Sequence, residues 1–257
     1  MSKKAEQQEP QEEEELEESS LLSHLVELRS RLLKATVSIL VVFVGLVPFA
    51  QEVFELVALP MMSQLPEGDS MIAIRPVSTL LTPIKMAFFV ALFATMPVVI
   101  YQGWAFVAPG LYKREKKVAF PLVSSSILLF YAGAAFAYFV VFPLMFNFLA
   151  RVAPEGVAVM PDIGEYLDLV TVLFFTFGLA FEVPIAILML VGAGIISPES
   201  LGKKRPYVLL GAFTLGMFLT PPDMISQTLL AIPMYLLFEL GIIMSRIMIK
   251  KREKQEE

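Results

Sequence analysis

The chain has 257 residues, of which 56% are hydrophobic, and its mean hydropathy is +0.70. This composition is typical of an integral membrane protein and excludes an ordinary soluble domain. The sequence has no cysteine and a single histidine, His24. Disulfides, thiolate chemistry and soft metal sites are therefore excluded, and only one imidazole is available for catalysis.

The N-terminal part differs in composition from the rest. A dense acidic run, Glu6–Glu18, precedes the apolar part, and without it the net charge of -5 would become slightly positive. Residues 1–20 hold too few apolar side chains to offset the entropy that ordering costs, so we expect a disordered acidic tail. From Leu21 on, leucines recur at helical spacing with Glu27 and Arg31 on the opposite side. This pattern predicts an amphipathic helix at the cytoplasmic surface that runs into the first span.

Apolar runs long enough to cross a bilayer follow this helix. They are Leu33–Ala50, Met86–Val107, Val118–Leu149 and Leu167–Ile195, with two shorter runs at Tyr207–Thr220 and Thr228–Ser245. Pro206 and the Pro221-Pro222 pair limit the fifth run to ~14 residues, which span only ~21 Å of a ~30 Å hydrocarbon core. Such a helix requires a locally thin bilayer or a larger assembly, unless Lys204 and Arg205 reach the interface and lengthen it. We predict an all-α integral membrane protein with six transmembrane helices, the last two of them short.

Lysine and arginine predict the orientation of the chain. They concentrate in the N-terminal region and in three further segments, Lys113–Lys117, Lys203–Arg205 and Lys250–Lys254. The intervening loops hold only Arg75, Lys85 and Arg151. By the positive-inside rule, both the N- and C-termini are cytoplasmic.

Prolines inside the spans favour bent helices, because each removes a backbone donor. They are Pro97, Pro121, Pro143, Pro184 and Pro233. We therefore expect a curved, concave arrangement and not a straight bundle. The chain divides into the acidic tail 1–20, a six-helix transmembrane domain 21–246 and a charged cytoplasmic tail 247–257.

No sequence pattern for catalysis is present. Glycine-rich phosphate loops, the G-x-S-x-G elbow, H-E-x-x-H and Cys/His metal spacings are all missing. We therefore expect no enzyme activity, no catalytic or metal-binding residues, no cofactor and no nucleic-acid partner. A solvated or capping role is expected for His24.

Two carboxylates are expected at the cytoplasmic surface, where a basic peptide would arrive. Glu27 lies within i,i+4 reach of Arg31, and Glu115 is a lone acid among the four basic residues of Lys113–Lys117. An ordinary helix ion pair explains Glu27, and local charge balance explains Glu115. The alternative is that each carboxylate binds a guanidinium group of a ligand.

Glu182 is unusual because it lies well inside the fourth span, where an ionised carboxylate costs ~2.5 kcal/mol or more. Such a group faces protein or water, or is held neutral, and a functional or subunit-contact role competes with a structural one. It also allows a different function, a proton-coupled small-solute transporter with Glu182 as proton carrier. Asp223 and Gln227 cluster at the outer turn between the short helices, where helix capping is the simplest explanation.

Several stretches carry a resemblance to a known family. They are Ser23–Leu32 (SHLVELRSRL), Phe106–Glu115 (FVAPGLYKRE), Phe181–Pro184 (FEVP), Lys203–Tyr207 (KKRPY) and Thr220–Asp223 (TPPD). In their order and spacing, from about Leu21 to Arg246, they resemble the TatC family, the core subunits of the twin-arginine protein translocase. The resemblance implies a receptor for signal peptides with consecutive arginines. Such a receptor passes folded proteins across the bacterial cytoplasmic (inner) membrane with the proton-motive force.

The resemblance also implies partners and residue roles. The partners are TatA- and TatB-like single-span subunits, the lipid bilayer and further copies of the chain in a larger complex. Glu27 and Glu115 would meet the two arginines of the signal peptide. The other implied residues of the signal-peptide site are Phe106 and Leu111, which line it, Arg29, which orders the N-terminal helix, and Pro60, which matches a position important in the family. Glu182, Gln227 and the neighbouring Asp223 would be polar groups of the membrane face that contact partner helices or the inserted signal peptide.

Overall fold

The computed structural model describes residues 9–62, 72–111, 116–145, 162–219 and 224–256, and this part of the chain is helical apart from short connections. The helices are α1 (Glu9–Leu46), α2 (Ala50–Met62), α3 (Ser78–Leu111), α4 (Lys116–Phe136), α6 (Ile163–Gly192), α7 (Pro198–Lys203), α8 (Arg205–Leu219) and α9 (Met224–Glu256). A 3-10 turn, η1 (Val47–Phe49), joins α1 to α2, and a π-helical turn, η2 (Ala137–Val141), follows α4. The predicted all-α class is confirmed for the described residues.

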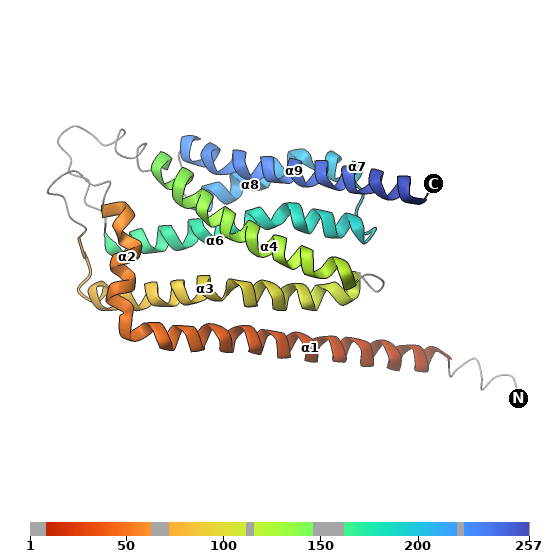
Figure 1. Ribbon diagram of the computed structural model, residues 1–257, viewed down its shortest axis with the longest axis horizontal. Coiled ribbons are helices and arrows are strands. Elements are labelled where there is room, and N and C mark those ends of the chain that lie inside the picture. Colours follow the sequence, from red (N-terminus) through yellow and green to blue (C-terminus); the bar gives the residue numbers. More distant parts are fainter. Residues whose placement is uncertain (1–8, 63–71, 112–115, 146–161, 220–223, 257) are drawn as a thin grey trace, which may run out of the picture.

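The long helices α1, α3, α4, α6 and α9 lie roughly along one axis, and α2 crosses the end at which α1 finishes (Figure 1). The first residues of α1 and the last residues of α9 lie at the same end of the molecule (Figure 1). The stretches that are long and apolar enough to cross a membrane are Leu22–Ala58, Ser78–Phe106, Pro121–Met145, Ile163–Gly192 and Gln227–Lys251. The chain is thus a multi-pass membrane protein with five such spans among its described residues. With 15 residues, α8 is shorter than these.

One prediction about helix length is wrong. The last helix is not short, because α9 has 33 residues and continues past Ser245 to Glu256. At the other end of the chain, α1 begins at Glu9, inside the acidic segment 1–20. Both extensions are rich in Glu, Lys, Arg or Gln, which are good helix formers, and an apolar helix already nucleated beside them can propagate into them.

Glycines bring the membrane helices into close contact. A Cβ atom on Gly178 of α6 would lie 2.5 Å from the ring of Phe130 on α4, and one on Gly133 of α4 would meet the backbone carbonyl oxygen of Phe177 on α6. Small residues at helix crossings are typical of membrane proteins, where van der Waals packing drives helix association. The close contact between α4 and α6 therefore requires glycine, which has no side chain, at these two positions.

Prolines lie inside the helices, as the sequence predicted: Pro121 in α4, Pro184 in α6 and Pro233 in α9. The π-helical turn η2 ends just before a further proline, Pro143, and its closing hydrogen bond runs from the N–H of Phe142 to the carbonyl oxygen of Ala137. Such a turn is a common way to change helix register next to a residue without a backbone donor.

Side-chain and backbone caps fix both ends of α6. The carboxylate of Asp162 accepts hydrogen bonds from the N–H groups of Gly164 and Glu165, and its other oxygen accepts one from Ile74 N–H at 2.8 Å. This capping and the link to residue 74 hold the pKa of Asp162 below its usual value, with the Ile74 hydrogen bond as the largest cause. At the other end, Gly194 adopts a positive φ of 74°, and Ile195 N–H donates to the carbonyl oxygen of Leu190, which closes the helix in a Schellman motif.

Candidate functional site

The predicted carboxylate Glu27 is engaged by a guanidinium group of its own helix. Arg31 Nε donates to Glu27 Oε1 at 2.9 Å, and Arg31 Nη2 donates to the same oxygen at 2.6 Å. The remaining nitrogen, Nη1, reaches Gln102 Oε1 on α3 at 3.4 Å. The Glu27 side chain is 37% exposed and that of Arg31 is 22% exposed. The i,i+4 ion pair that the sequence predicted for Glu27 is therefore present. Arg31 also links α1 to α3 through its contact with Gln102.

An aromatic contact lies one turn away from this ion pair. The ring of His24 stacks on Phe106 of α3, with ring centroids 4.4 Å apart and an interplanar angle of 24°. Gln102 and Phe106 are four residues apart, so both lie on the face of α3 that meets α1. The structure thus brings Glu27 and Phe106 of the predicted site to one surface, together with His24, Arg31 and Gln102. His24 remains exposed, but its ring is stacked and not simply solvated.

The other predicted residues of this site are placed differently or lie outside the described residues. Arg29 is exposed on α1. Leu111 is the last residue of α3 and Pro60 belongs to α2, but the side chains of both lie outside the described part of the chain. Glu115 lies outside it altogether. Because α2 crosses the far end of α1 (Figure 1), the structure does not bring Pro60 to the surface that carries Glu27.

A second polar cluster lies among α3, α4 and α6. Trp104 Nε1 donates to Ser126 Oγ at 2.7 Å, and the Ser126 hydroxyl donates in turn to Glu182 Oε2. Ser126 is fully buried, and the second oxygen, Glu182 Oε1, is buried without a hydrogen-bond partner among the described residues. A buried carboxylate oxygen without a donor is costly, so the cluster has one position that a further polar group can satisfy.

Sequence reasoning identified Glu182 but missed the other two members of this hydrogen-bond chain, Ser126 and Trp104. Trp104 is the single tryptophan of the chain, and Ser126 ends a run of three serines, so both are distinctive in composition. No spacing links them to Glu182, however, because they belong to three different helices. On α3, Trp104 lies between Gln102 and Phe106 and therefore points away from α1 towards α4.

Further polar residues lie where α8 and α9 meet. Gln227 lies near the start of α9 and close to α8. A Cβ atom added to Gly216 of α8 would lie 3.4 Å from the Gln227 backbone. Asp223 lies outside the described residues. Glu239 on α9 accepts hydrogen bonds from Arg205 Nε and Nη2 at 2.6 and 2.7 Å, and from the Tyr235 hydroxyl at 2.9 Å. Arg205 therefore pairs with α9.

Comparison with known families decides the assignment. A family model described as "Sec-independent protein translocase protein (TatC)" matches residues 23–233, which is most of the chain. The chain belongs to the TatC family. The matched region contains Glu27, Phe106 and the buried carboxylate Glu182. The chain is thus a membrane component of a protein translocase.

Named TatC proteins are similar over nearly the whole length. The Sec-independent protein translocase protein TatC of Escherichia coli (strain K12) is 56% identical over 237 residues, which cover 92% of each chain. The TatC protein of Aquifex aeolicus (strain VF5) is 37% identical over 236 residues, 91% of this chain and 98% of that one. A crystal structure of the twin arginine translocase receptor TatC is 38% identical and superposes with a TM-score of 0.78 over 87% of this chain and 98% of that one. None of these relatives supports the alternative of a small-solute transporter.

Proposed function

We propose that this chain is the signal-peptide receptor of a twin-arginine translocase, with Glu27 as one of its two arginine-binding carboxylates. The observation that carries the proposal is the contact between Arg31 and Glu27, in which two guanidinium nitrogens reach a single carboxylate oxygen. This surface already binds a guanidinium group, and its partial exposure leaves it open to a peptide. The TatC crystal structure similar to this chain is itself described as a twin arginine translocase receptor.

In this proposal, an arginine of the signal peptide competes with Arg31 for Glu27. Planar guanidinium groups suit a carboxylate because they donate in a fixed fork, which an ammonium group does not offer. Gln102 provides an amide oxygen beside the site and can accept a hydrogen bond from the displaced Arg31. His24 and Phe106 supply a stacked aromatic surface at which the peptide's apolar side chains can pack. Glu115 is proposed for the second arginine, with Leu111 lining the site and Arg29 ordering α1.

We also propose a topology with six transmembrane helices and both termini in the cytoplasm. The helix α8 would be a sixth span, with about 22 Å of helix at 1.5 Å per residue in a locally thin bilayer. An even number of crossings is compatible with the ends of α1 and α9 lying together (Figure 1). The basic segments would make that end cytoplasmic. The membrane would be the bacterial inner membrane, and the helices would form the concave wall that the prolines predict.

We further propose that Glu182 is a contact point for partner helices in the membrane. Its unsatisfied buried oxygen calls for a donor, and a polar side chain of a single-span TatA- or TatB-like subunit would provide one. Gln227 and Asp223 would be additional polar contacts for partner helices. Pro60 would act at the outer end of the molecule. Several copies of the chain would assemble into a larger complex. The chain would catalyse no reaction, since transport would draw on the proton-motive force.

Peptide binding to the full chain in nanodiscs tests the central assignment. A fluorescent twin-arginine signal peptide should bind Glu27→Gln and Glu115→Gln roughly tenfold or more weakly than the unmodified chain, because each variant loses a charge-assisted hydrogen bond. The matched control is Glu55→Gln, an exposed glutamate on α2 near the opposite end. Unchanged affinity in the first two variants would remove the proposed receptor site. A solute transporter would instead require solute uptake by the isolated chain in liposomes under a pH gradient.

A further inference from the structure

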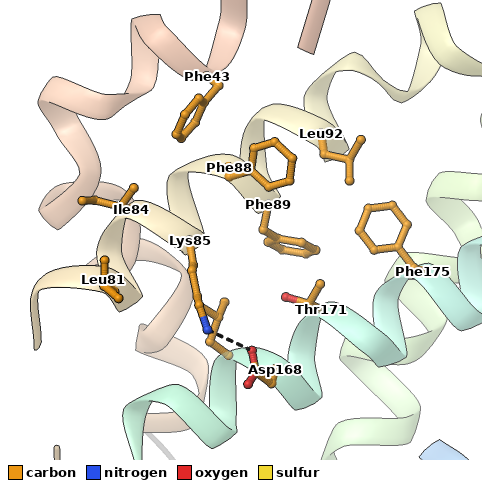
Figure 2. A pocket seen from close by; sticks show the side chains of 11 residues that line it. Phe43, Leu81, Ile84, Lys85, Phe88, Phe89, Leu92, Asp168, Thr171 and Phe175 are labelled. Carbon is orange, nitrogen blue, oxygen red and sulfur yellow. Dashed lines mark ion pairs between the residues drawn. The ribbon is translucent and has the colours of Figure 1, made fainter. Parts of the chain in front are cut away.

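Two adjoining cavities lie at the end of the molecule opposite the start of α1. The first, of about 340 Å³, lies among α1, α3 and α6 and is mostly apolar (Figure 2). The second, of about 310 Å³, is lined by the loop before α3 and by the first turns of α3 and α6. Leu81, Lys85 and Asp168 line both cavities. Because they share these lining residues, we treat the two neighbouring cavities as one surface feature, which we call the α3–α6 groove.

The polarity of the α3–α6 groove changes along the helices. On α3 the lining residues pass from Ser78 through Lys85 to Phe88 and Leu92, and all of them lie on one face. On α6 the lining passes in the same way from Glu165 through Asp168 to Thr171 and Phe175. From Ser78 to Leu92 the helix advances ~21 Å, which is about the depth of a headgroup region and much of one leaflet. The groove is therefore amphiphilic in the direction of the membrane normal.

The polar end carries charges of both signs. Arg75, Lys85, Asp162, Glu165 and Asp168 line the polar cavity. Asp162 keeps its charge while it caps α6, and Arg75 offsets that charge electrostatically. An anionic ligand would meet carboxylates there, and a cationic one would meet basic groups. A zwitterionic ligand complements this arrangement, because it can place each of its charges beside the opposite one.

The ion pair between Lys85 and Asp168 has room for such a ligand. Lys85 Nζ lies 3.9 Å from Asp168 Oδ1, which is longer than a hydrogen bond, and the two side chains are 61% and 66% exposed (Figure 2). On the far side of the pair from the polar cavity, Phe43, Phe88 and Phe175 line the apolar cavity (Figure 2). Phe43 and Phe88 are in edge-to-face contact at 5.5 Å, so this part of the wall is formed by packed rings.

We propose that the α3–α6 groove binds one phospholipid with a zwitterionic, primary-ammonium headgroup, of the phosphatidylethanolamine type. Its phosphate would bind Lys85, its ammonium group would donate to Asp168, and an acyl chain would fill the apolar cavity. A partner helix is a poorer occupant, since a helix with its side chains is ~10–12 Å across, whereas cavities of this volume are typical of small-molecule sites. The proposal does not depend on the signal-peptide site, which lies on a different surface.

Native mass spectrometry of the full chain tests the proposal with three lipids of identical acyl chains. Phosphatidylethanolamine should bind more tightly than phosphatidylcholine, whose ammonium group has no N–H, and more tightly than anionic phosphatidylglycerol. Lys85→Gln and Asp168→Asn should each weaken phosphatidylethanolamine binding about tenfold, as expected for one charge-assisted hydrogen bond. Lys203→Gln and Glu199→Gln on α7, both exposed, are the matched controls and should bind as the unmodified chain does.

A variant of the apolar end separates a lipid site from a site for the headgroup alone. Thr171→Phe places a ring in the apolar cavity and should weaken binding of all three lipids, while soluble glycerophosphoethanolamine should show no measurable binding to any form of the chain. The proposal is overturned if phosphatidylglycerol binds as tightly as phosphatidylethanolamine, or if Lys85→Gln and Asp168→Asn bind normally. It is also overturned if a photo-cross-linker at Leu81, in native membranes, captures a polypeptide instead of a lipid.

Discussion

Two nitrogens of Arg31, Nε and Nη2, donate to the same oxygen of Glu27, at 2.9 and 2.6 Å. No hydrogen bond to the other oxygen, Oε2, is found among the described residues. The carboxylate is therefore only partly used by its own helix. In the proposed receptor, Arg31 holds Glu27 in place when no peptide is bound and competes with the peptide when one arrives.

Removing Arg31 should therefore strengthen peptide binding. Partly exposed ion pairs contribute up to about 1 kcal/mol, so Arg31→Ala should raise the affinity for a twin-arginine peptide by up to roughly fivefold. Fluorescence anisotropy with the chain in nanodiscs measures this change. Lys34→Ala, an exposed cation one turn further along α1, is the control and should leave the affinity unaltered. Weaker binding by Arg31→Ala would mean that Arg31 assists the peptide and does not compete with it.

The glycine contact between α4 and α6 should be intolerant of a methyl group. In Gly178→Ala the new Cβ would collide with the Phe130 ring, and overpacking of this kind costs about 1–3 kcal/mol. The melting temperature in detergent should fall. Gly211→Ala on α8 is the matched control, because no atom lies within 4 Å of its added Cβ. That variant should be as stable as the unmodified chain or more stable, since alanine is the better helix former. Equal melting temperatures for the two variants would argue against close packing at Gly178.

The hydrogen-bond chain from Trp104 to Glu182 can be tested by a double-mutant cycle. Ser126→Ala leaves Glu182 without its donor and Trp104 without its acceptor, so it should lower the free energy of unfolding by about 1–3 kcal/mol. In a Glu182→Leu background the same change should cost much less, because no buried carboxylate remains to be satisfied. Denaturant unfolding in detergent gives all four values. Additive effects would show that Ser126 and Glu182 do not interact.

The Asp162 cap should make stability depend on pH at the acidic end. Hydrogen bonds from backbone N–H groups, that of Ile74 above all, hold its pKa below the usual value in the folded chain. The stabilisation is therefore fully present above the unfolded pKa of about 3.9 and is lost as the pH falls through the lower folded value. Asp162→Asn keeps a good N-cap but cannot titrate, so its stability should change less between about pH 5 and pH 2. A pH profile identical to that of the unmodified chain would contradict the assigned role.

Much of the fold follows from local sequence patterns. Apolar runs and prolines predicted the spans, because the bilayer imposes a minimum length and satisfies no backbone group. The length of α9 was underestimated for a related reason. Hydropathy marks where the helix leaves the membrane, whereas the helix itself continues through the charged residues to Glu256.

Contacts between distant helices could not be predicted from the sequence in the same way. Glu27 and Arg31 are neighbours on one helix, and their pairing was foreseen from their spacing. Lys85 and Asp168 lie on α3 and α6, and their sequence separation says nothing about their meeting. The same is true of Arg31 and Gln102, whose contact depends on how α1 packs against α3. The sequence therefore predicted Glu27 and Glu182, whereas Asp168 and the partners on other helices were found only in the structure.

The most direct test of the receptor proposal is a thermodynamic cycle between the chain and the peptide. Binding is measured for the unmodified chain and Glu27→Gln, each with a twin-arginine peptide and with peptides in which either arginine is replaced by glutamine. For one of the two arginines, the account predicts a coupling energy with Glu27 of about 1.5 kcal/mol or more, as for other hydrogen bonds between charged groups. Strictly additive losses for both arginines would contradict it.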